Sequence, residues 1–106
     1  MSPSLSIYIT TPSREMAETI ARTLVEERLA ACVNIIPGMH SIYRWKGKVE
    51  TADEVVLIAK TSAELFDKLE KSVKQLHSYE VPCIVAWPIE AGHKPYLDWL
   101  EKETAA

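Results

Sequence analysis

Residues 31–59 read ACVNIIPGMHSIYRWKGKVETADEVVLIA, and this stretch decides the fold. Apolar and polar residues alternate on both sides of Lys46-Gly47, where a glycine suits a tight turn. The two halves are therefore predicted to be the arms of one long β-hairpin. Pro37-Gly38 interrupts the first arm, but the alternation resumes at residues 42–45. This pattern indicates a bulge within a continuous strand.

The segments on either side of the hairpin complete a two-part pattern. Residues 5–10 predict a strand, and apolar residues at helical spacing predict a helix that follows it and runs to about residue 29. Thr61-Ser62-Ala63-Glu64 has the form of a capping box and predicts a second helix. Residues 81–89 predict a fourth strand, and residues 92–95 should open a short last helix.

This order predicts an α+β fold of the ferredoxin-like βαββαβ kind, as one domain over residues 1–106. The sheet should be antiparallel, with both main helices on one face. At a rise of ~3.3 Å per residue, each hairpin arm reaches roughly 40 Å. A domain of this length has a radius of gyration of only about 13 Å. The apolar tip must therefore project beyond the core or fold over sharply, and we expect it to join a neighbouring subunit's sheet.

Composition excludes some classes of function. The chain has 47% hydrophobic and 25% charged residues with a net charge of −3, so the basic surface that nucleic acids require is missing. The longest apolar runs, residues 55–59 and 81–89, are too short to span a membrane. The first six residues do not resemble a signal peptide, which predicts a cytoplasmic location. Cys32 and Cys83 lie in apolar contexts, and reduced, buried thiols are expected.

Four segments carry a resemblance to the CutA (divalent-cation tolerance) family. They are residues 29–34 (LAACVN), residues 41–47 (SIYRWKG), Glu54 with Lys60-Thr61, and residues 77–82 (HSYEVP). The resemblance implies a homotrimer with long interlocking hairpins, similar to the PII signalling proteins. It also implies a link to divalent metal-ion tolerance, with copper binding assigned in some members. It implies no known enzyme activity.

The resemblance also bears on a metal site. Two of the three positions that hold copper ligands in some family members correspond here to Ile9 and Leu76, neither of which can bind a metal. Only His77 remains as a candidate ligand, and its place at a helix end also suits a capping role. The sequence therefore predicts no required cofactor and only weak binding of copper or another divalent cation.

The candidate ligand-binding residues are polar or aromatic and lie near predicted turns and strand ends: Trp45, Glu54, Lys60, Tyr79 and Glu80. They could form a structural ion-pair network or line a cleft between subunits. Tyr43, Trp45 and Trp87 could line a pocket, but interface packing is the favoured interpretation.

Two classes of function remain open. One is a trimeric small-ligand or metal-responsive binding and signalling protein. The other is an enzyme with a composite active site at the subunit junction, for which His77, Tyr79, Glu80 and Lys60 would be candidates. With only three glycines and no Gly-x-Ser-x-Gly motif, the chain has no phosphate-binding glycine loop and no nucleophile elbow. Binding is therefore favoured over catalysis.

Overall fold

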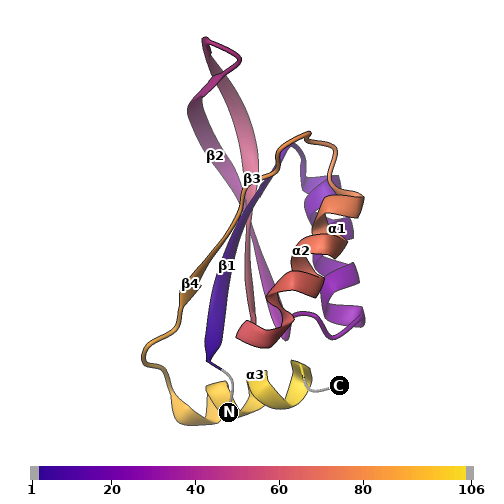
Figure 1. Ribbon diagram of the computed structural model, residues 1–106, viewed down its shortest axis with the longest axis vertical. Helices are drawn as coiled ribbons and strands as arrows, with labels where there is room; N and C mark the ends of the chain where they lie inside the picture. The colour runs from indigo at the N-terminus through magenta and orange to yellow at the C-terminus, as the bar shows by residue number, and fades with distance from the viewer. Residues whose placement is uncertain (1–2, 105–106) are drawn as a thin grey trace.

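The fold is a sheet with helices packed against it, and the computed structural model describes residues 3–104 (Figure 1). The elements in chain order are β1 (Ser4–Thr11), α1 (Arg14–Glu26), β2 (Cys32–Trp45), β3 (Lys48–Ser62), the short 3₁₀ helix η1 (Ala63–Leu65), α2 (Phe66–Leu76), β4 (Ile84–Pro88) and α3 (Lys94–Thr104). The strands form one antiparallel sheet in the order β2-β3-β1-β4. Both α1 and α2 cover one face of it (Figure 1). The predicted ferredoxin-like fold is confirmed.

The core lies between the sheet and these two helices. Ile7 and Ile9 of β1 are fully buried, and Ile9 stands opposite Leu57 of β3, which is also fully buried. Ile20 and Leu24 of α1 complete the same cluster. Each such side chain stabilises the fold by about 1.5–3 kcal/mol relative to exposure. Because successive side chains of a strand point to opposite faces, Tyr8 and Thr10 of β1 lie on the other face of the sheet.

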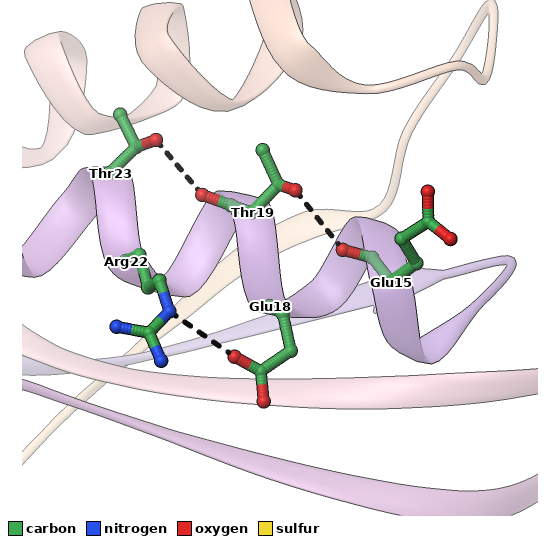
Figure 2. A network of polar contacts seen from close by, with 5 residues as sticks. All are labelled: Glu15, Glu18, Thr19, Arg22 and Thr23. Atoms are coloured by element: carbon green, nitrogen blue, oxygen red, sulfur yellow. Dashed lines mark hydrogen bonds and ion pairs between the residues drawn. The ribbon is translucent and has the colours of Figure 1, made fainter.

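Helix α1 begins at Arg14. The Ser13 side chain accepts a hydrogen bond of 3.1 Å from the Met16 N–H, as an N-cap residue should. Figure 2 shows the exposed side of the helix, where Arg22 pairs with Glu18 at 3.5 Å. The Thr19 and Thr23 hydroxyls donate to backbone carbonyls one turn earlier. This polar row marks the solvent face of α1 and leaves its other face for the core.

The β2–β3 hairpin rises past the ends of α1 and α2, so the chain measures 44 × 25 × 22 Å (Figure 1). The strand register shifts between Ile36 and Met39, which confirms a bulge at Pro37-Gly38 within a continuous strand. The hairpin turns at Lys46 and Gly47, both of which have positive φ, 50° and 81°. Positive φ at both central residues is typical of a type I′ turn, whose twist matches that of the strands.

Three sequence predictions about element ends were wrong. Helix α1 ends at Glu26, before the expected end near residue 29. Residues 61–64 do not form a capping box, because β3 continues to Ser62 and the side chains there have other partners. The Thr61 hydroxyl donates to the Leu29 carbonyl at 2.6 Å, and the Ser62 hydroxyl bonds that of Thr104 at 3.1 Å. The fourth strand begins at Ile84 instead of residue 81, because the His77 ring bonds the Thr10 carbonyl just beyond the paired segment.

Candidate functional site

A groove of about 610 Å³ lies between the hairpin and residues 78–83, which lead into β4. Tyr8 and Thr10 of β1 line it, so it lies on the sheet face opposite α1 and α2. Its volume is within the range of small-molecule sites. The groove exists because the hairpin outreaches the core and leaves the upper part of this sheet face without a covering helix.

Glu54 of β3 is the buried acidic group of the groove and is only 8% exposed. The Tyr79 hydroxyl donates a hydrogen bond of 2.8 Å to Glu54 Oε2. The bulge in β2 places Met39 opposite Glu54, and the Tyr8 hydroxyl donates to the Met39 sulfur at 3.2 Å. Within residues 3–104, no ion pair involves the Glu54 carboxylate. The groove therefore holds a buried carboxylate whose one hydrogen-bonding partner in the described part of the chain is a neutral hydroxyl.

Aromatic side chains form the outer part of the groove. Tyr43 and Trp45 come from the end of β2 and are both partly exposed. The Lys46 ammonium lies 5.6 Å from the centroid of the Trp45 ring and 3.9 Å from Glu80 Oε2. Both charged side chains of this pair are largely exposed, so the contact contributes little to stability. It does join the hairpin tip to the segment that precedes β4.

His77 directly follows the last residue of α2, lies beside the groove and is itself buried. Its Nδ1 accepts a hydrogen bond of 3.1 Å from the Tyr79 N–H. Its Nε2 donates to the Thr10 carbonyl at 2.7 Å, which fixes the tautomer with the proton on Nε2. Both ring nitrogens are thus occupied by backbone groups. His77 holds Tyr79 in place, and its ring bonds a strand carbonyl rather than the last carbonyls of the helix.

The electrostatics of the groove follow from burial and from Glu54. Burial, the hydrogen bond to Glu54 and its negative charge raise the pKa of the Tyr79 hydroxyl well above its usual range. Burial, and secondarily the Glu54 charge, raises the pKa of the Cys83 thiol. Both groups therefore keep their protons near neutral pH, and the Cys83 thiolate that a nucleophile or soft metal site would need is disfavoured.

The raised pKa of Tyr79 predicts a change in alkaline stability. The folded protein keeps this proton to a higher pH than the unfolded chain, whose tyrosines titrate near pH ~10. The stabilisation is therefore complete below that pH and is lost as pH rises toward the folded-state pKa. In urea unfolding between pH ~7 and pH ~11, we expect the unaltered protein to lose stability more steeply than Tyr79→Phe. Parallel losses in the two proteins would contradict this prediction.

The structure brings together most of the predicted ligand-binding residues. Trp45, Glu54, Tyr79 and Glu80 line the same groove. Lys60 does not, because it lies six residues along β3 from Glu54, where its ammonium bonds the Asn34 side chain. The sequence reasoning missed Tyr8 and Thr10, which also line the groove, and the alternation in β1 could have identified them. Trp87 is outside the groove and packs against Tyr8, with ring centroids 5.5 Å apart.

The family model described as CutA1 divalent ion tolerance protein matches residues 5–103. The chain belongs to this family. The divalent-cation tolerance protein CutA of Thermus thermophilus is 57% identical over 92% of this chain and 95% of its own. Its solved structure superposes with a TM-score of 0.94 at 55% identity, covering 96% of this chain and 99% of the other. A chloroplastic CutA 1 protein of rice is 46% identical over 96% of this chain, which spans 58% of that longer protein.

The residues at the three positions that the resemblance implies for copper do not fit a copper site. Ile9 lies fully buried in the core, Leu76 is the apolar last residue of α2, and neither ring nitrogen of His77 is free. Across residues 3–104 there is no group of three or more His, Cys, Asp or Glu side chains placed to hold a metal ion. Weak copper binding stays a prediction.

The names of two relatives in the CutA1 family state a cellular location for those proteins. A solved Archaeoglobus fulgidus relative, 49% identical with a TM-score of 0.93 over 96% of this chain and 99% of that chain, is described as periplasmic, and the rice relative as chloroplastic. None of the helices among the described residues is long and apolar enough to cross a membrane. The cytoplasmic location expected from the sequence stays a prediction.

Proposed function

We propose that this CutA1 family member works as a homotrimer that binds a small ligand in the groove at each subunit junction. Divalent metal-ion tolerance would then depend on a binding or signalling event, as the similarity to the PII signalling proteins implies. The observation that carries the proposal is the groove itself, where a buried carboxylate, a tyrosine hydroxyl and aromatic rings converge beside the projecting hairpin. Such convergent polar groups in a largely apolar hollow are typical of ligand sites.

The trimer part of the proposal rests on exposed apolar side chains. Ile42 and Val49 of the hairpin are 70% and 62% exposed, and Trp87 of β4 is 51% exposed. These residues lie on strands, where exposed apolar edges lead to aggregation unless another chain covers them. Exchange of hairpins between three copies would cover them and would place parts of a neighbouring subunit beside the groove. The occupant of the groove would then be enclosed by two chains.

The enzyme alternative finds less support than binding. A nucleophilic pair of Cys83 and His77 would need a thiolate and a free ring nitrogen. Burial raises the pKa of the Cys83 thiol, and both His77 nitrogens bond backbone groups. Tyr79 and Glu54 remain as polar groups of the groove, and their hydrogen bond suits the recognition of a ligand.

A thermal-shift screen of metals and metabolites tests the binding proposal, because a ligand of the native state raises the melting temperature. We expect at least one small molecule to raise it in the unaltered protein. Its effect should fall in Tyr43→Ala, which removes one aromatic wall, and should persist in Arg22→Ala on the far side of α1. A broad screen without any hit would contradict a ligand-binding groove. So would hits that raise the melting temperature of Tyr43→Ala as much as that of the unaltered protein.

Copper should bind weakly and without a defined site. Tight binding needs several correctly placed ligands, and the His77 nitrogens are already engaged. Calorimetry under reducing conditions should show little difference between the unaltered protein and His77→Ala. Circular dichroism should first establish that the variant is folded, because it loses two hydrogen bonds. A sub-micromolar site, one per subunit, that disappears in His77→Ala would show that this prediction is wrong.

A further inference from the structure

The carboxylate of Glu54 is a buried charge that lacks a cation. It is 8% exposed, and among residues 3–104 it forms no ion pair. A buried carboxylate is costly unless it is paired, and one hydrogen bond from the neutral Tyr79 hydroxyl does not cancel its charge. The raised pKa values of Tyr79 and Cys83 carry a contribution from this charge, so its field reaches across the groove. The groove therefore selects for positive charge.

The walls of the groove also suit a cation. Tyr43, Trp45 and Tyr79 present aromatic rings, whose faces attract ammonium groups. The chain itself supplies an example at the rim, where the Lys46 ammonium lies 5.6 Å from the Trp45 ring centroid and 3.9 Å from Glu80. That ammonium is on an exposed side chain, so it leaves the deeper position beside Glu54 open to another cation.

We infer that the groove binds a small organic cation, a primary alkylammonium, with its charged head at the Glu54 carboxylate. The apolar stem would lie against Tyr43 and Val81, which line the same groove. An ammonium donates hydrogen bonds that a carboxylate can accept, which a quaternary cation cannot do. This inference rests on the proposed function, since it names the ligand class of the same groove.

Binding of n-butylammonium chloride to the full chain tests the inference, with n-butanol and sodium butyrate as neutral and anionic controls at equal ionic strength. We expect n-butylammonium to raise the melting temperature and the two controls to leave it unchanged. In Glu54→Gln, which keeps the shape and an acceptor for Tyr79, affinity should fall about tenfold or more. Asp53→Asn removes the same charge one residue away, from a side chain that is 92% exposed, and should bind normally.

A second variant keeps the test decisive if Glu54→Gln does not fold. Tyr43→Leu removes an aromatic face and retains an apolar wall, so it should also weaken n-butylammonium binding. Equal binding by Glu54→Gln and Asp53→Asn, or equal effects of butylammonium and butyrate, would overturn the inference. So would a trimer in which a lysine of a neighbouring copy pairs with Glu54.

Failure of this inference differs from failure of the proposed function. If the protein is a trimer and its groove binds an anion or a neutral molecule, the proposed function stands and the ammonium inference falls. If the groove binds nothing in the broad screen, the proposed function falls as well.

Discussion

Replacing Trp45 with aspartate is expected to break the proposed trimer into smaller species at micromolar concentration. Trp45 ends β2 at the tip of the projecting hairpin and is 37% exposed in the single chain. In the proposed assembly a neighbouring subunit would cover it, so Trp45→Asp would place an unpaired charge in each interface. Loss of a central tryptophan alone often costs about 2 kcal/mol or more, and the symmetry of a trimer repeats that cost at every interface.

Val25→Asp is the matched control for this substitution. Val25 lies near the C-terminal end of α1 and is 42% exposed, and that end of the helix points away from the hairpin tip (Figure 1). It therefore introduces the same charge at a similarly exposed apolar position outside the proposed interface. Native mass spectrometry should find Val25→Asp assembled like the unaltered protein and Trp45→Asp dissociated. Equal assembly of both variants would show that the hairpin tip is not part of an interface.

Leu24→Ala is expected to cause the largest loss of stability without touching the groove. Leu24 is fully buried between α1 and the sheet, and large-to-small changes at such positions cost about 2–5 kcal/mol. The next residue provides the control, because Val25→Ala shortens a side chain that is already 42% exposed. That change should stay within about 0.5 kcal/mol.

Urea unfolding at one fixed protein concentration compares these two variants. The concentration must be fixed because assembly contributes to the apparent stability. A loss below about 1 kcal/mol in Leu24→Ala, or equal losses in the two variants, would contradict the position of the core described above. The result also separates folding of the subunit from assembly, since neither residue lies on the hairpin.

The sequence predicts the fold well where the period of the side chains is unambiguous. Alternation on both sides of Pro37-Gly38 predicts one strand with a bulge, and the register shift between Ile36 and Met39 confirms it. The sequence-based prediction fails where contacts with distant elements determine the local structure. The hydroxyls of Thr61 and Ser62 suit a helix cap, but a carbonyl and another hydroxyl of distant elements bind them instead.

Most of the candidate site could also be predicted from the sequence. Trp45 and Glu54 come from the two arms of one hairpin, so a correct hairpin places them at the same end of the molecule. Tyr79 and Glu80 follow the second helix and approach from the other side. Lys60 was misplaced because it lies six residues, about 20 Å, from Glu54 toward the base of the hairpin, whereas the groove runs from Glu54 toward the tip. The hydrogen bonds made by the two ring nitrogens of His77 could not be predicted from the sequence.

The mass of the unaltered protein under native conditions tests the proposed trimer and its junction groove most directly. At micromolar concentration we predict a single species with three times the mass of the 11.9 kDa chain. Three hairpins would then cover the exposed residues of the hairpin and β4. A stable monomer or dimer under the same conditions would contradict the trimer, and with it the placement of the groove at a subunit junction.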